Sequence, residues 1–207
     1  MNRPPRARQT VLDAARRIVE TRGAGQLTFE TLAEESGITR GGITYHFPTK
    51  EALLKALIEA DLAQWEEAAQ VEVQALDDGT TCPRRAQAAR LLGHVRCSLA
   101  EDDDGHRRFV SGLLSAAMAD PELLDPVRAH VQREFADWRW DEADLERYLL
   151  LLAADGLFWS RLFGLSPVSA EVRLRLAARI EQRLRDLTGL AASEAPSSFP
   201  SSPSSDP

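Results

Sequence analysis

The amino-acid sequence predicts an all-α protein of about nine helices, with a short N-terminal domain joined by a long helix to a larger helical body. Apolar residues recur at helical spacing along most of the chain. No stretch of alternating β-branched residues is bounded by turn signals, and glycine and proline fall between the apolar runs. With 207 residues the chain is long enough to bury a sizeable core.

N-caps and helix breakers divide the chain into its predicted elements. The expected helices cover about residues 6–22, 28–36, 39–46, 50–76, 83–101, 106–119, 121–138, 142–164 and 167–188. Thr28, Thr39, Asp141 and Ser166 are residue types that cap helix N-termini. The last segment, residues 191–207, is rich in serine and proline and cannot bury enough apolar surface to offset its ordering entropy. We therefore expect this tail to be disordered.

Residues 28–46 form a helix-turn-helix candidate, because two short predicted helices are joined there by the turn Ser36-Gly37-Ile38. The second helix contains the adjacent glycines Gly41 and Gly42, and each costs roughly 1 kcal/mol against alanine. Its other exposed residues are of hydrogen-bonding types. A helix of this composition favours close approach to DNA, with the helix in the major groove.

The start of the long helix carries a second indication of DNA binding. Lys50 stands at its first position, where the helix dipole already disfavours a positive charge. Lysine beside free backbone N–H groups is a good phosphate site, and Thr28 has a similar place at an earlier helix start. Arg40 is the main candidate for a base or phosphate contact near the helix start. For His46, a core or capping role and a phosphate contact are equal alternatives. The predicted DNA-binding residues are Thr28, Thr39, Arg40, Gly41, Gly42, Thr44, Tyr45, His46 and Lys50.

The segment LTFETLAEESGITRGGITYHFPTKEALLKALIE, from Leu27 to Glu59, resembles the DNA-binding domain of the TetR family of bacterial transcriptional regulators. The residues that carry the resemblance are Thr28, Ala33, Gly37, the run Tyr45-His46-Phe47 and the run Lys50-Glu51-Ala52-Leu53. It extends over about residues 6–66. It implies a cytoplasmic regulator that binds a palindromic operator as a homodimer and usually represses. Thr44 departs from the family, many members of which have an aromatic residue there, so the operator sequence cannot be deduced.

The resemblance also implies a domain division. Residues 6–66 are expected to form the helix-turn-helix DNA-binding domain, and residues 67–190 a helical ligand-binding and dimerisation domain. The formal charge follows the same division. The whole chain carries −7, which argues weakly against DNA binding, but residues 1–60 carry +2 and the remainder −9. A slightly basic head on an acidic body indicates two parts with different partners.

A stripe of small residues predicts the dimer interface. Ala153, Gly156, Ser160 and Gly164 recur every three or four residues, so that a partner helix can approach closely. The resemblance implies that the last two long helices form a four-helix bundle with those of a second copy, which adds Ile180 and Leu184. Packing within one chain is the alternative.

The ligand site is predicted from bulky residues of the body. Asp155 lies in an apolar run and, if it faces inward, needs a partner or a ligand. The resemblance implies an inducer cavity, for which Phe109, Met118 and Trp159 are the further candidates. Ordinary core packing is the alternative for each of them.

The sequence also indicates several classes to which the protein is not expected to belong. The four histidines and two cysteines have no metal-ligand spacing, no catalytic signature or phosphate loop appears, and the longest apolar run has seven residues. We therefore expect no enzyme activity, no metal or cofactor and no membrane span. The predicted function is a sequence-specific transcriptional regulator, a repressor released by a small-molecule ligand. The alternative is a helical interaction protein that has a helix-turn-helix but no ligand response.

Overall fold

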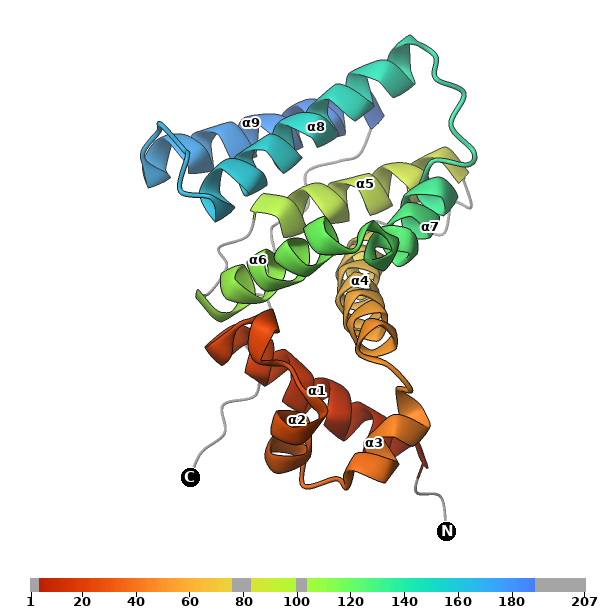
Figure 1. Ribbon diagram of the computed structural model, residues 1–207. Helices are drawn as coiled ribbons and strands as arrows, with labels where there is room; N and C mark the ends of the chain where they lie inside the picture. The colour runs from red at the N-terminus through yellow and green to blue at the C-terminus, as the bar shows by residue number, and fades with distance from the viewer. Residues whose placement is uncertain (1–3, 76–82, 100–103, 189–207) are drawn as a thin grey trace. The chain divides into compact units, whose positions relative to one another are not determined.

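The computed structural model describes residues 4–75, 83–99 and 104–188, and all regular secondary structure in these residues is helical (Figure 1). The elements are α1 (Pro4–Arg22), η1 (Ala24–Gln26), α2 (Phe29–Ser36), α3 (Arg40–His46), α4 (Lys50–Ala75), α5 (Pro83–Leu99), α6 (Asp104–Ala119), η2 (Pro121–Leu124), α7 (Asp125–Glu134), α8 (Glu142–Leu162) and α9 (Ala170–Thr188). The all-α prediction is confirmed. The tail predicted to be disordered, residues 191–207, lies outside the described residues.

Two predicted helices differ from the structure by more than two residues, whereas the others lie within two residues of their predicted bounds. The helix expected at residues 121–138 is a 3-10 turn, η2, followed by α7, which ends at Glu134. The last helix begins at Ala170 rather than at residue 167, because Ser169 caps it in place of Ser166. The Ser169 Oγ accepts a hydrogen bond from the Val172 N–H at 3.3 Å, as an N-cap does.

The chain divides into two compact units that do not follow the division predicted at residue 66. The first unit comprises residues 1–64 and 102–138, and the second comprises residues 65–101 and 139–207, so that α4 crosses from one to the other. The first unit therefore includes α6, η2 and α7 together with the helix-turn-helix. Each unit has its own set of packed helices.

The first unit is held together chiefly by α1 against α6. Gly112 of α6 permits the close approach, since a Cβ there would lie 2.9 Å from Cγ1 of Val19 on α1. The Arg108 Nε also donates a 2.6 Å hydrogen bond from α6 to the Glu20 carbonyl of α1. Apolar residues of α1 to α4, α6 and η2 complete a common core, with Val11, Ile18, Leu32, Ile43, Leu53 and Phe109 among its most buried members.

The second unit contains the end of α4 and a bundle of three long helices, α5, α8 and α9, each of which packs against the other two (Figure 1). Leu92 and Val95 of α5, Ala154 of α8 and Leu184 of α9 are inaccessible to solvent. No helix among the described residues is long and apolar enough to cross a membrane.

Candidate DNA-binding site and ligand site

The helix-turn-helix is built by local hydrogen bonds, which include the predicted N-cap at Thr28. The Thr28 Oγ1 accepts a hydrogen bond from the Thr31 N–H at 3.1 Å, and the Thr31 Oγ1 accepts one from the Thr28 N–H at 3.1 Å. This reciprocal pair begins α2. Gly37 ends α2 with φ of +68°, a left-handed conformation that glycine adopts without a steric penalty.

Helix α3 is anchored from one side and open on the other. Thr39 caps it through a 3.3 Å hydrogen bond from the Gly42 N–H, which confirms the predicted N-cap. Ile43 and the following Phe47 are 0% and 2% exposed and fix the helix on the core. Tyr45, in contrast, is 81% exposed. Tyr45 therefore lies on the side of α3 that is open to solvent.

The two glycines of α3 have different structural explanations. A Cβ on Gly42 would lie 3.0 Å from Cγ2 of Ile38, so packing against the turn accounts for this glycine. A Cβ on Gly41 would meet nothing within 4 Å. No contact within the described chain therefore requires glycine at residue 41, although alanine would be the better helix former.

Charged side chains around α3 are paired with neighbouring carboxylates. Arg40, at the first position of α3, forms an ion pair with Glu30 of α2, and both side chains are more than 60% exposed. Sequence reasoning missed Glu30 as a neighbour of Arg40 because the two are ten residues apart and the turn brings them together. Arg17 and Arg22 of α1 both contact Glu35, each at 3.2 Å.

The start of α4 combines a cap with the predicted lysine. The Thr49 Oγ1 accepts a 3.1 Å hydrogen bond from the Ala52 N–H. Lys50 is the first helical residue, and its Nζ donates a 3.3 Å hydrogen bond to the Ala24 carbonyl of η1, which leaves further N–H donors on the ammonium group. The pKa of Glu51 is lowered, chiefly by hydrogen bonds from its own backbone N–H and from Thr49.

Four more residues predicted to contact DNA differ in their exposure. Thr28 and Thr39 are exposed, whereas Thr44 and His46 are half-buried. The Thr44 Oγ1 donates a 3.2 Å hydrogen bond to the Gly41 carbonyl, and the His46 ring lies edge-on to Tyr45, with 5.1 Å between the ring centroids.

Arg16 forms a junction of α1, α4 and α6 that the sequence did not indicate. Its guanidinium contacts Glu20 at 2.8 Å, Asp61 of α4 at 3.0 Å and the His106 Nδ1 of α6 at 3.2 Å. The same group lies over the Phe109 ring, 4.2 Å from its centroid. This one side chain links α1 and α4 to α6 within the first unit.

In the second unit, α8 exposes an apolar face. Its large residues Leu145, Leu149, Leu152, Trp159 and Phe163 are 40–60% exposed. With Gly156 they are spaced alternately by four and three residues, which places them on one stripe of the helix. The predicted interface residues Ala153 and Gly156 are exposed and Ser160 is half-buried, and a Cβ on Gly156 would meet nothing within 4 Å.

Three residues predicted for the dimer interface are placed elsewhere. Ile180 and Leu184 are 8% and 0% exposed, so the core of their own unit already covers them. Gly164 follows the end of α8 with φ of +66° and donates to the Arg161 carbonyl at 3.0 Å. Together with a 2.7 Å bond from the Leu165 N–H to the Ser160 carbonyl, this is the glycine turn that ends many helices.

The four predicted ligand residues do not share a site within either unit. Phe109 and Met118 belong to the first unit, where Phe109 is inaccessible in the core and Met118 is 79% exposed. Asp155 and Trp159 belong to the second, where Trp159 lies on the exposed stripe, stacked with Phe163. Met118 faces solvent and Phe109 fills a packed core in the first unit, and their place in a ligand site stays a prediction.

Asp155 has polar partners, as expected for a carboxylate in an apolar run of residues. One oxygen lies 3.2 Å from the His94 Nε2 and accepts a hydrogen bond from the Ser98 Oγ at 3.3 Å, both on α5. The His94 ring lies 5.5 Å from that of Trp65, and the Trp65 ring lies edge-on to Phe158 at 6.1 Å. These contacts join α4, α5 and α8 within the second unit.

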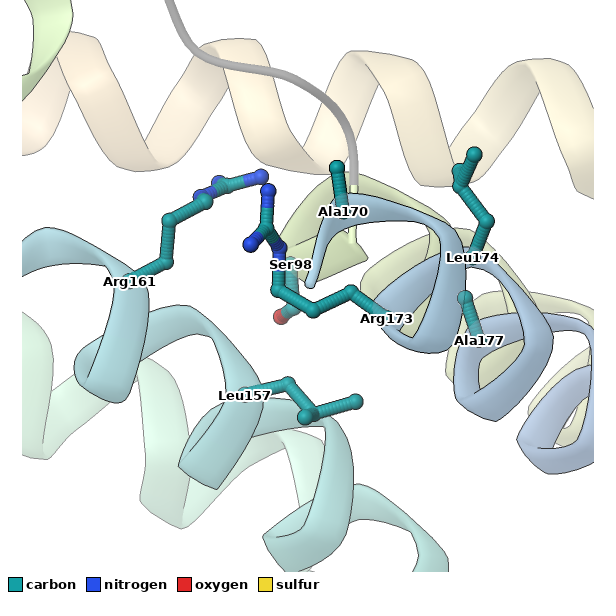
Figure 2. A pocket seen from close by; sticks show the side chains of 7 residues that line it. All are labelled: Ser98, Leu157, Arg161, Ala170, Arg173, Leu174 and Ala177. Carbon is teal, nitrogen blue, oxygen red and sulfur yellow. The ribbon is translucent and has the colours of Figure 1, made fainter. Parts of the chain in front are cut away.

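A small pocket of the second unit opens between α5, α8 and α9 (Figure 2). Its lining residues are Ser98, Leu157, Arg161, Ala170, Arg173, Leu174 and Ala177. Sequence reasoning found none of them, because the pocket depends on how three separate helices pack. Among the described residues no group of three or more potential metal ligands lies together.

A helix-turn-helix with an open second helix, followed by further long helices, defines the chain as a helix-turn-helix regulatory protein by class. The family profile described as "Bacterial regulatory proteins, tetR family" matches residues 11–57. The profile described as "Tetracyclin repressor-like, C-terminal domain" matches residues 89–185. The chain belongs to the TetR family.

Individual relatives match over part of the chain. The transcriptional regulator TtgR of Pseudomonas putida is 38% identical over 53 residues, which cover 26% of this chain and 25% of TtgR. The transcriptional repressor AcnR of Corynebacterium glutamicum is 38% identical over 66 residues, covering 32% and 35%. The chain thus matches a quarter to about a third of these relatives' length.

Solved structures match over almost the whole chain. The multidrug binding protein EbrR complexed with ethidium is 28% identical, with a TM-score of 0.56 and coverage of 85% of this chain and 98% of that one. A TetR-family regulator from Mesorhizobium loti has a TM-score of 0.60 at 14% identity, covering 91% and 98%. The second match supports the fold alone.

Proposed function

We propose that this chain is a sequence-specific transcriptional regulator that binds a palindromic operator as a homodimer and leaves it when a small molecule binds. The observation that carries the proposal is the open face of α3. Arg40, Gly41 and Tyr45 are exposed there on a helix that Ile43 anchors to the core. The major groove admits such a helix, and arginine at its start reaches guanine edges or phosphates.

Residues 1–60 carry a net charge of only +2, so individual phosphate contacts have to supply much of the affinity for DNA. Lys50 at the start of α4 and Thr28 at the start of α2 lie at helix N-termini, where backbone N–H groups favour an anion. Such contacts position a protein on DNA without reading its sequence. We assign sequence reading to Arg40 and the residues beside it.

The apolar stripe of α8 is the proposed dimer interface. A glycine inside a helix costs about 1 kcal/mol against alanine, and no contact within the described chain requires Gly156. Close approach of a second α8 accounts both for this glycine and for the exposed Leu149, Leu152 and Trp159. Dimerisation would present two α3 helices to successive major grooves, about 34–36 Å apart.

The ligand response is proposed to act through α4, which begins in the first unit and ends in the second. Trp65 of α4 contacts His94 of α5 and Phe158 of α8. A ligand that changes the packing of α5 and α8 would move this end of α4. The ligand weakens operator binding only if it binds more tightly to the conformation in which the two α3 helices are misplaced. The names of AcnR, a repressor, and EbrR, a multidrug binding protein, support repression and a ligand response.

A mobility-shift titration with duplex DNA tests the proposal. The expected complex contains two chains per duplex, and replacing both Arg40 and Tyr45 by alanine abolishes it while leaving the melting temperature unchanged. A double variant that binds the same duplex as tightly as the parent would contradict the role of α3. A tight complex of one chain per duplex would contradict the dimer.

A further inference from the structure

The ion pair between Glu30 and Arg40 joins the two helices of the helix-turn-helix. Glu30 is the second residue of α2 and Arg40 the first residue of α3. The Arg40 Nη1 donates a 2.5 Å hydrogen bond to the Glu30 Oε1, and the two side chains are 68% and 62% exposed. An ion pair this open contributes little to the stability of a protein. Stabilisation of the fold is therefore a weak explanation for this pair.

A second glutamate of α2, Glu35, has partners on a different helix. Its carboxylate contacts Arg17 and Arg22 of α1 at 3.2 Å each, and its side chain is 27% exposed. These contacts connect α2 to its neighbour α1. Glu30 is connected instead to α3, the helix proposed to enter the major groove. In the described part of the chain, Glu30 and Arg40 are each other's one ionic partner.

The ion pair leaves three hydrogen-bonding groups open. Arginine has N–H donors on three nitrogens, and the contact with Glu30 is made by Nη1. The edge formed by Nε and Nη2 of Arg40 therefore keeps two donors in a fixed plane, and the Glu30 Oε2 keeps its acceptor lone pairs. Gly41, the next residue, adds no side chain beside the pair. The pair thus offers two donors and one acceptor to a ligand.

This pattern of donors and acceptor matches the major-groove edge of a G·C base pair. Guanine presents two acceptors there, N7 and O6, and the paired cytosine presents the donor of its N4 amino group. Arginine binds both guanine acceptors in a bidentate manner, and glutamate accepts from the cytosine amino group. An A·T pair presents a donor, the adenine N6 amino group, where the second arginine donor needs an acceptor.

The carboxylate of Glu30 also disfavours the use of Arg40 on phosphate. The ion pair has no net charge and the glutamate repels phosphate oxygens, so the pair gains little from the release of counterions. The same contact restricts the long arginine side chain, whose planar donors are then oriented before DNA binds. Pairing with Glu30 therefore favours a directional contact with a base over a contact with the backbone.

We propose that Glu30 determines the sequence specificity of this protein together with Arg40. The pair reads one G·C base pair in each operator half-site, with Arg40 on guanine and Glu30 on the paired cytosine. Glu30 also positions the guanidinium of Arg40 through the ion pair. The inference rests on the proposed function, because it requires α3 to lie in the major groove. It adds the second residue and the base pair that the two residues read.

Competition binding with the full-length chain tests the inference, on the duplex enriched from a random library and on its single base-pair variants. Glu30→Ala should lower the preference for G·C by about tenfold or more at one position of each half-site, the position at which Arg40→Ala acts. Glu30→Gln keeps an acceptor oxygen without the charge and should lose less. The double variant should lose less than the product of the two single losses, because the two side chains act as one unit. A loss at different positions, or at none, would overturn the inference.

Binding to an unrelated duplex distinguishes this role from a structural one. Glu30→Ala should bind that duplex about threefold or more tightly than the parent and with a steeper salt dependence, because Arg40 is then free to contact a phosphate. Glu35→Gln is the matched control, since it removes an ion-paired glutamate of the same helix and should change neither base preference nor salt dependence. Melting temperatures show that each variant is folded. Weaker or unchanged binding by Glu30→Ala would overturn the positioning role.

A modified duplex tests the contact with cytosine separately. Replacing that cytosine by a pyrimidine without the amino group should weaken binding of the parent and of Glu35→Gln more than binding of Glu30→Ala. Equal losses in all three would overturn the contact. Selective binding that Glu30→Ala leaves unchanged would overturn this inference alone, whereas no selective binding to any duplex would overturn the proposed function with it.

Discussion

Helices α3 and α8 both expose residues that take little part in the packing of their own units. The exposed residues of α3 are chiefly hydrogen-bonding types, whereas those of α8 are apolar. On α3 the open positions are Arg40, Gly41 and Tyr45, which offer hydrogen bonds and a close backbone approach. On α8 they are Leu149 and Trp159 with their neighbours on an apolar stripe. Polar exposure on a short anchored helix suits DNA, whereas apolar exposure along a 21-residue helix suits another helix. On the proposed function, one chain thus carries two surfaces for two different partners.

Gly156→Leu is expected to have the largest effect. The chain has open space around residue 156, so the fold tolerates the leucine, but a partner helix cannot approach past it. The dimer dissociation constant should rise by about thirtyfold or more, as at an interface hot spot, and operator affinity should fall with it. Sedimentation velocity over a concentration series measures this, with Gly156→Ala as the milder control. A leucine variant that dimerises normally would remove the α8 stripe from the interface.

Arg40→Ala tests the reading role of α3. Loss of a bidentate base contact should cost about 1–3 kcal/mol on the preferred sequence and relax the choice of base at one position. Competition binding against duplexes with single base changes measures the discrimination. Glu30→Gln, which frees Arg40 from its ion pair, is the companion variant. Unchanged discrimination in Arg40→Ala would show that the arginine serves only phosphates.

The two glycines of α3 give a matched pair of variants. Gly41→Ala should stabilise the free protein by up to about 1 kcal/mol, because alanine is the better helix former and its Cβ meets nothing. The same Cβ should weaken DNA binding if the backbone approaches the duplex. Gly42→Ala should gain less stability, because its Cβ would lie 3.0 Å from Ile38. Urea unfolding and a mobility shift together check both, and tight DNA binding by Gly41→Ala would place that residue away from the duplex.

Lys50→Ala tests the predicted phosphate contact at the start of α4. One phosphate contact fewer should weaken binding to all sequences alike and reduce the slope of log affinity against log salt by about 1. Affinities measured on one specific and one unrelated duplex over a range of salt concentrations give both quantities. An unchanged slope would mean that Lys50 serves only its hydrogen bond to Ala24.

Asp125→Asn should have the smallest effect. A hydrogen bond from Lys55, joined by one from Arg128, lowers the pKa of Asp125, so the ionised carboxylate stabilises the folded state. A lowered pKa means that this stabilisation is present above the ordinary pKa of aspartate and disappears as the pH falls through the lowered value. The parent should therefore be slightly more stable than the variant at pH 7 and equally stable in acid, as measured by thermal melting. A difference that grows towards low pH would reverse the assigned sign.

The local structure of the helix-turn-helix could be predicted from the sequence better than the packing of α8 and α9. Thr28, Thr39 and Gly37 act through neighbours three or four residues away, so their types and spacing suffice to place the helix-turn-helix. Its open face could also be predicted, because Ile43 and Phe47 mark the buried side. The pairing of Arg40 with Glu30 needs the turn geometry and was not foreseen.

The packing of α8 and α9 could not be predicted from the sequence, because both helices are apolar on more than one side. Periodicity does not say which face of such a helix meets its own unit. Leu184 and Leu149 look alike in sequence, yet the first is inaccessible and the second 60% exposed. Gly164 fitted the stripe of small residues by spacing, but its positive φ shows that it ends the helix. Pockets such as the one beside Arg173 depend on three helices and have no local signal.

Selection from a library of random duplex DNA with the full-length chain tests the central claim most directly. The account predicts enrichment of an inverted repeat whose half-sites are centred about one helical turn apart or a multiple of it. Arg40→Ala should relax the choice of base at symmetric positions of the two half-sites. Enrichment of no motif, or of an unrepeated motif that Arg40→Ala leaves unchanged, would contradict the account.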